Sequence, residues 1–418
     1  MDLSKVKATK AEAAKYMESE INHNIRKFGK RGPGDPGERQ AVEYMAERCK
    51  EYGCEQSKVE SFDLHPAAFM GWIYITATVV LASFIMMMVA ILLPTLPALA
   101  ATIMFAASIA LILIGAIIMI AEFVLYRELV DKIYPKKTSC NLTATKKPTG
   151  EIKRRLFYNG HPDAACEWTL NYLGGGVLFV GHIVYSMIGL LLLAAIAVCA
   201  LAGVSHDILS ILIYVTIAFV PAWILLYILW NEKIIVDGAN DNLTGCYMGI
   251  AVLKALKDQG IELEHTEVGV LISGSEEAGL RGAKAWCKAH PEYSDKGDVE
   301  TLIISFDTIH EGRFLQVNQR DLNLTVKANV KAGNMFKAAA DKVGVTCNLG
   351  NVPLGATDSA AFNQAGFKAT GITAMDHNLQ DYYHTRKDTI GNLDLLGLAD
   401  CFATSVQFLE DYENEDNK

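Results

Sequence analysis

Four long apolar stretches constrain this chain more than any other feature, because each must lie either in a protein core or in lipid. They come in two pairs, at about residues 67–93 and 98–126, and at about 176–204 and 208–230. Each is long enough to cross ~30 Å of hydrocarbon as a helix that rises ~1.5 Å per residue. Four buried core helices are the alternative, but the length of the stretches and their near absence of charge disfavour it. The sequence therefore predicts two membrane-spanning hairpins.

The apolar residues, 51% of the chain, are concentrated in these two zones. The remainder reads as one soluble-type domain that is long enough to bury a sizeable core. We therefore predict a domain built from residues 1–66, 127–175 and 231–418, interrupted by one hairpin at 67–126 and another at 176–230.

Charges near the spans predict the orientation of this protein in the membrane. The hairpin tips carry no Lys or Arg, whereas the opposite ends carry Arg127, Lys132, Lys136, Lys137 and Lys233. By the positive-inside rule, the tips face outward and every polar segment is cytoplasmic. The nine cysteines have no CxxC pairs or framework spacing, which is typical of reduced thiols in a reducing compartment. The net charge of −9 argues against a nucleic-acid partner.

Strand and helix patterns alternate through the polar segments. Apolar runs at 154–160, 266–273, 301–306 and 368–373 are typical of strands, and helical patterns lie near 243–258, 279–289 and 333–343, with a last helix at the carboxyl end. This alternation predicts an α/β fold with a mostly parallel central sheet and helices on both faces. In such sheets, functional residues collect at the carboxyl ends of the strands.

Five polar clusters lie just after predicted strands or at predicted helix starts. Taken singly, each has an ordinary explanation as a loop, a turn or a helix cap. Together they supply two histidines and five carboxylates: His161, Asp163, Asp241, Glu276, Glu277, Asp307 and His384. Zinc binds imidazole nitrogen and carboxylate oxygen at about 2 Å. A pair of such ions supplies hydroxide at neutral pH and polarises a scissile carbonyl.

In this order the clusters resemble the co-catalytic zinc aminopeptidase family, which includes bacterial leucyl aminopeptidases, glutamate carboxypeptidase II and glutaminyl cyclases. The segment 31–39 and the pair Thr357–Asp358 extend the resemblance over essentially all of the polar chain. It implies an α/β/α peptidase domain, two Zn²⁺ ions and a peptide substrate. The two hairpins depart from the soluble members of the family, and Thr244 stands where serine is commoner.

The resemblance also implies a role for each site residue. Five residues are implied metal ligands: His161 and Asp307 for the first ion, Glu277 and His384 for the second, and Asp241 as the bridge between them. Glu276 is implied to be the general base of catalysis, and Asp163 the partner that orients His161. Manganese or cobalt in place of zinc stays open.

These observations favour a membrane-anchored aminopeptidase. A carboxypeptidase or an N-acyl amino acid hydrolase of the same family stays open, because the choice of aminopeptidase depends on analogy. A glutaminyl cyclase is disfavoured by the intact His161-Pro162-Asp163, and a non-catalytic receptor or scaffold by the complete ligand set. A transporter is disfavoured because the spans hold only Glu122 and His182 as ionisable groups. The oligomeric state stays open.

Overall fold

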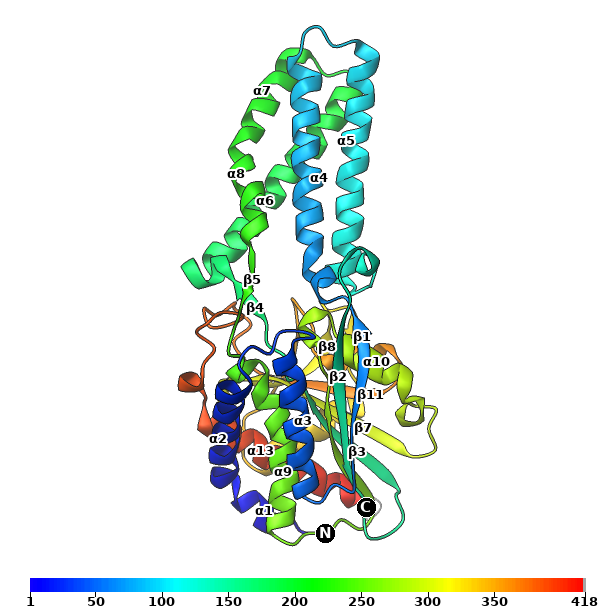
Figure 1. The fold of residues 1–418 in the computed structure, drawn as a ribbon, viewed down its shortest axis with the longest axis vertical. Helices are drawn as coiled ribbons and strands as arrows, with labels where there is room; N and C mark the ends of the chain where they lie inside the picture. The colour runs from blue at the N-terminus through cyan, green and yellow to red at the C-terminus, as the bar shows by residue number, and fades with distance from the viewer. Residues whose placement is uncertain (416–418) are drawn as a thin grey trace. The chain divides into compact units, whose positions relative to one another are not determined.

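The computed structural model describes residues 1–415, and they form two compact units (Figure 1). Unit 1 contains Met1–Pro66, Lys136–Glu167 and Glu232–Lys418, and unit 2 contains Ala67–Pro135 and Trp168–Asn231. Unit 1 thus collects three separate polar segments of the chain, and unit 2 collects the apolar stretches.

A nine-stranded sheet forms the centre of unit 1. Its strands are β1 (Gln56–Leu64), β2 (Lys137–Lys146), β3 (Arg154–Gly160), β6 (Thr266–Ile272), β7 (Glu300–Ile309), β8 (Leu315–Asp321), β9 (Val326–Lys327), β10 (Asn348–Asn351) and β11 (Lys368–Ala374). The order is β1-β2-β6-β3-β7-β11-β8-β10, and β9 pairs with β8. The central strands β6, β3, β7 and β11 are parallel, as the βα pattern predicts.

The outer strands make the sheet mixed. On one side β2 is antiparallel to β6 and to β1, and on the other β8 is antiparallel to β11. The connection from β7 to β8 shows why: only residues 310–314 join them, too few for the crossover that a parallel strand needs. The prediction of a mostly parallel sheet therefore holds for its centre, and the edges differ.

Helices cover both faces of the sheet, so neighbouring residues of a central strand are buried in opposite directions. Tyr158 of β3 donates a hydrogen bond to the carbonyl of Ser405, while Phe157 packs edge-on against Trp286. Both β3 side chains are 1% exposed. The helices of unit 1 are α1 (Ser4–Ala8), α2 (Lys10–Phe28), α3 (Pro36–Glu51), α9 (Thr244–Asp258), α10 (Arg281–Ala289), α11 (Val330–Lys342), α12 (Asp358–Gln364) and α13 (Leu395–Glu413).

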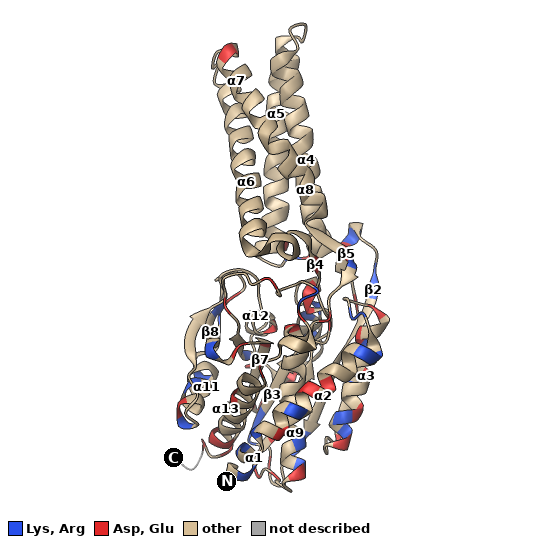
Figure 2. Cartoon of the chain, turned by 90° about the vertical axis from the view of Figure 1, so that its left-hand side faces the viewer, with Lys and Arg blue, Asp and Glu red and all other residues tan. Residues whose placement is uncertain are grey.

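Unit 2 consists mainly of four helices long and apolar enough to cross a membrane. They are α4 (Pro66–Leu92); α5 (Ala98–Met119), continued by the π-helical turn Ile120–Val124; α6 (Thr169–Leu201); and α7 (His206–Thr216), continued to Ile228 through α8 (Val220–Leu225). Figure 2 shows almost no Lys, Arg, Asp or Glu on these helices. Helix α6 begins seven residues before the predicted start at 176, and Gly174 and Gly175 kink it there.

The apolar helices are not buried as a soluble core would be. Only 22–33% of the most apolar window of each helix is buried. Small and polar side chains make the close contacts: Ser83 and Ser108 each donate to the other's carbonyl, and the Trp223 indole donates to the carbonyl of Ser186. This combination of apolar exteriors and small-residue contacts is typical of helices packed in lipid.

A two-stranded ribbon, β4 (Cys166–Trp168) and β5 (Trp230–Ile235), marks the points where the chain leaves unit 1 for the second hairpin and returns.

All nine cysteines are free, as the sequence predicts.

Candidate metal centre

Three neighbouring parallel strands bring the predicted site residues together. His161 directly follows β3, Glu276 and Glu277 lie in the turn after β6, and Asp307 lies near the end of β7. Because β6, β3 and β7 are adjacent and parallel, their carboxyl ends meet at one edge of the sheet. Asp241, just before α9, and His384, in the loop after β11, complete the cluster.

The first group of side chains surrounds His161. Its Nε2 atom lies 3.4 Å from Asp241 Oδ1, 3.8 Å from Glu276 Oε2 and 3.9 Å from Asp307 Oδ2. His161, Asp241 and Asp307 offer ligand atoms that all lie within 4.8 Å of one another, and all three residues are buried.

The second group surrounds His384, whose Nε2 atom lies 3.0 Å from Asp241 Oδ2 and 3.2 Å from Glu277 Oε1. Asp241 belongs to both groups. Its Oδ1 atom faces His161 and its Oδ2 atom faces His384. One carboxylate therefore joins two potential metal sites.

The spacing of these atoms fits metal coordination. Two ligands that each lie about 2 Å from a tetrahedral zinc ion are themselves about 3.3 Å apart. The separations of 3.0, 3.2 and 3.4 Å match that value. Among the described residues, the buried atoms His161 Nε2 and Glu277 Oε1 have no hydrogen-bond partner. Buried polar atoms are normally satisfied, so these two fit groups that bind an ion.

The electrostatics of the cluster favour a cation. Burial raises the pKa of Asp307 to about 8, and the neighbouring Asp241 carboxylate adds to this rise. Burial also raises the pKa of Glu276 well above its usual range. Burial alone would lower the pKa of His384, but Glu277 and Asp241 raise it to about 10. Buried acids that resist ionisation and imidazoles that retain protons indicate a shortage of positive charge, which divalent cations would supply.

Two buried carboxylates hold the segment that carries the adjacent glutamates. Asp163 accepts hydrogen bonds from the backbone N–H of Glu276 (3.1 Å) and of Glu277 (3.0 Å). Glu38 accepts from the backbone N–H of Ser275 (2.5 Å) and from its hydroxyl (2.9 Å). Ser275 has left-handed backbone angles, φ 57° and ψ 44°, which a non-glycine residue adopts only with such support.

Asp163 also lies beside His161, as the resemblance implies. The His161 Nδ1 atom is 3.3 Å from the Asp163 carbonyl oxygen and 3.4 Å from its Oδ1 atom. Asp163 thus contacts the predicted ligand His161 and the predicted base Glu276 at once.

Arg31 and Asp388 fix the loops around Asp241. The buried Arg31 guanidinium donates to the carbonyls of Pro162 (2.8 Å) and Asp237 (2.6 Å), so it joins the loop after His161 to the loop before Asp241. Asp388 accepts from the backbone N–H groups of Asn240 (2.9 Å) and Asp241 (3.1 Å).

Sequence reasoning gave no role to Glu38 or Arg31. Both lie in the Gly- and Pro-rich segment 31–39, which extends the family resemblance without a role for its charged residues.

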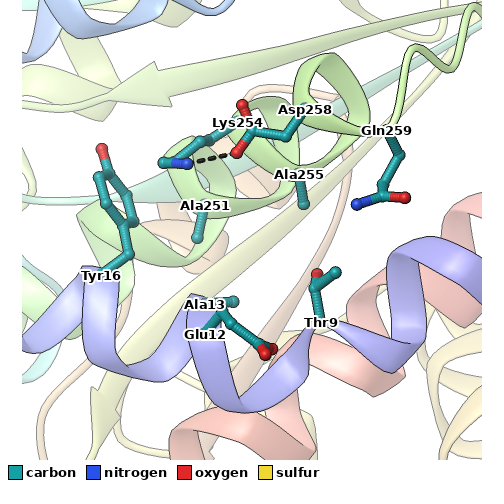
Figure 3. Close-up of a pocket in the computed structure, with 9 residues that line it drawn as sticks. All are labelled: Thr9, Glu12, Ala13, Tyr16, Ala251, Lys254, Ala255, Asp258 and Gln259. Carbon is teal, nitrogen blue, oxygen red and sulfur yellow. Dashed lines mark hydrogen bonds and ion pairs between the residues drawn. The ribbon is translucent and has the colours of Figure 1, made fainter.

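A separate hollow lies between α2 and α9 (Figure 3). The residues that line it are Thr9, Glu12, Ala13, Tyr16, Ala251, Lys254, Ala255, Asp258 and Gln259. Two of its three charged residues, Lys254 and Asp258, already bond to each other, and none of the predicted site residues lines it. The potential metal ligands therefore lie at the carboxyl ends of the parallel strands and not in this hollow.

Comparison with known proteins agrees with this fold. Residues 227–409 match the sequence profile of Peptidase family M28, a range that includes five of the seven predicted site residues: Asp241, Glu276, Glu277, Asp307 and His384. No curated protein sequence matches the chain.

Solved structures share the fold at low identity. A zinc aminopeptidase from Bacillus subtilis is 14% identical with a TM-score of 0.53, over 94% of each chain. An aminopeptidase from Aneurinibacillus sp. strain AM-1 is 14% identical with a TM-score of 0.54, over 97% of this chain and 95% of that one. Glutaminyl cyclase from Porphyromonas gingivalis is 11% identical with a TM-score of 0.53, over 96% of this chain and 98% of that one.

Proposed function

We propose that this chain, a metallopeptidase with an M28 peptidase domain, is a membrane-anchored aminopeptidase that removes N-terminal residues from peptides. The observation that carries the proposal is the position of Asp241, whose two carboxylate oxygens each face a different histidine. A carboxylate shared between two imidazoles is an arrangement that can hold a pair of divalent cations.

The proposed ligands are His161 and Asp307 for one ion, Glu277 and His384 for the other, and Asp241 for both. When bound, two zinc ions would supply Lewis acidity that lowers the pKa of a water molecule and polarises the scissile carbonyl. The buried surroundings of the cluster strengthen every charge interaction at this point, because little water screens it.

Glu276 is the proposed general base. It belongs to neither group of potential ligands, yet its Oε2 atom lies 3.8 Å from His161 Nε2 at the edge of the first group. In this role the Glu276 carboxylate would take a proton from the attacking water and return it to the leaving amine. Asp163, which holds the Glu276 backbone and contacts His161, is the proposed positioning residue.

Metal analysis and substrate comparison on the purified full chain test this function. We expect about two equivalents of zinc and hydrolysis of an aminoacyl amide that has a free amino group. The same amide with an acetylated amino group should be inert. Hydrolysis of the acetylated amide, or release of C-terminal residues, would support an N-acyl hydrolase or a carboxypeptidase of the family. Cyclisation of N-terminal glutamine without hydrolysis would support a glutaminyl cyclase, and absence of metal would contradict the proposal.

We further propose that both hairpins span the membrane and that the peptidase domain is cytoplasmic. The four apolar helices support insertion. The Lys and Arg residues at the hairpin bases, against none at the tips, support the orientation.

A further inference from the structure

An ion pair joins the segment that carries His384 to the strand that leads into the second hairpin. Arg386 lies two residues after His384. Its Nε atom is 2.6 Å from Glu167 Oε2, and its Nη2 atom is 2.7 Å from Glu167 Oε1. Glu167 is 2% exposed and Arg386 is 49% exposed. This two-point geometry fixes both side chains, which a single contact between charges does not.

The His384 segment depends on side-chain contacts for its shape. It lies between β11 and α13, residues 375–389 contain no helix or strand, and His384 itself has a positive φ of 51°. A non-glycine residue keeps such a conformation only when its surroundings determine it. On the carboxyl side, Asp388 bonds to the Asp241 loop. The Glu167–Arg386 pair supplies the fixed point between His384 and Asp388.

Glu167 belongs to the chain path that forms the second hairpin. It lies in β4, and helix α6 begins two residues later, at Thr169. The backbone N–H of Val236, on the returning chain, donates to the carbonyl of Ala165 at 3.0 Å. The base of the second hairpin, residues 165–167 and 232–236, is therefore a defined element of unit 1.

We propose that the Glu167–Arg386 ion pair is a positioning device for the metal ligand His384, through which the base of the second hairpin becomes part of the metal centre. The inference depends on the proposed two-metal function. Glu167 and Arg386 do not touch the reacting atoms; they act by fixing the backbone of the His384 segment. The pair affects the metal held by His384, Glu277 and Asp241, and leaves the side chains around His161 in place.

Three variants of the full chain in detergent test the inference: Arg386→Gln, Glu167→Gln and the double variant. Partners of metal ligands typically contribute about 10- to 100-fold to metal affinity. We therefore expect Arg386→Gln to raise the Kd of one of the two zinc equivalents by about 10- to 100-fold, measured by chelator competition, with the other equivalent unchanged. Because the two residues act as one unit, the double variant should resemble either single variant.

Asp381→Asn is the matched control. It removes the exposed Lys387–Asp381 ion pair (2.7 Å) from the same segment, and both zinc affinities should stay at the wild-type value. Arg386→Gln is the decisive variant for the inference. The Arg386 side chain is half-exposed, so its replacement leaves no cavity in the core.

Each other outcome overturns the inference. If Arg386→Gln bound both zinc equivalents as tightly as the wild type, the ion pair would not position His384. Equal weakening of both equivalents, or additive losses in the double variant, would indicate a general effect on the fold. If the wild-type protein bound no metal, the proposed function and the inference would both be wrong. If the wild-type protein binds two zinc ions but the variants behave otherwise than expected, only the inference is wrong.

Discussion

Asp241 is the residue on which both groups of the candidate centre depend, and its neighbours separate the roles of the two adjacent glutamates. Glu277 lies 3.2 Å from His384 within the second group. Glu276 belongs to neither group, although its Oε2 atom lies 3.8 Å from His161 Nε2, about as near as Asp307 Oδ2 at 3.9 Å. A ligand has to reach the ion, whereas a base has to reach a water molecule beside it. The geometry thus favours Glu276 as the base and Glu277 as the ligand.

Replacement of Glu276 by Gln tests this division of roles. The amide keeps the size of the side chain but cannot accept the proton, so kcat should fall by about two to four orders of magnitude. Zinc content, measured by elemental analysis, should stay at the wild-type value because no proposed ligand changes. Glu277→Gln is the control, and it should lose one zinc equivalent. Loss of metal in Glu276→Gln instead would mean that the two roles are exchanged.

Among the elements, the second hairpin depends on a glycine in α6 for its internal packing. A Cβ atom on Gly189 would lie 2.5 Å from Cγ of Phe219, closer than any real contact. Phe219 in turn packs on the rings of Tyr185 and Trp223. In lipid, helices associate mainly through such close packing of small residues.

Gly189→Leu should therefore destabilise the hairpin. Overpacking of this kind costs roughly 1–3 kcal/mol, so the thermal midpoint of the protein in detergent should fall by several degrees. Gly181→Leu is the matched control on the same helix, because a Cβ atom at Gly181 meets nothing within 4 Å. An equal loss in both variants would contradict the packing argument, since it would show that any added side chain on α6 is destabilising.

In the whole molecule, two apolar hairpins interrupt a single peptidase domain without dividing it. Unit 1 assembles from three segments of the chain, and strands from all three segments pair in its sheet. Each hairpin contributes two apolar helices, so if both cross the membrane the chain returns to the side from which it left. An even number of spans is thus the condition for one domain to form from all three segments.

Cysteine labelling in intact cells tests the orientation. Cysteines introduced at Thr95 or Ser205, at the hairpin tips, should react with a membrane-impermeant thiol reagent. Cysteines introduced beside Lys136 or Lys233 should not, because the Lys and Arg bias predicts that these positions are cytoplasmic. The partly exposed native residues Cys166 and Cys199 are first replaced by Ser. The reverse labelling pattern would place the peptidase domain outside the cell.

The sequence by itself determined the four apolar helices and the central parallel strands, and it predicted the residues that are proposed for the site. Each of these depends on a local pattern: an apolar length, an alternation, or a polar cluster at a strand end. Strand β2, which pairs with β1 and β6, has a largely polar sequence, Lys137–Lys146, and yet most of it is buried. Its alternating apolar residues Cys140, Leu142 and Ala144 lie in the core, but this short pattern was not among the predicted strands.

Only the tertiary structure decided which side chains meet at the site. Glu38 and Ser275 are 237 positions apart in the chain, and Glu167 and Arg386 are 219 positions apart. One carboxylate oxygen of Asp241 faces His161 and the other faces His384, and this too depends on how three distant segments come together. A local pattern specifies what a residue is able to bind, but the partner is set by sheet order and loop path. Those follow from the packing of the whole domain.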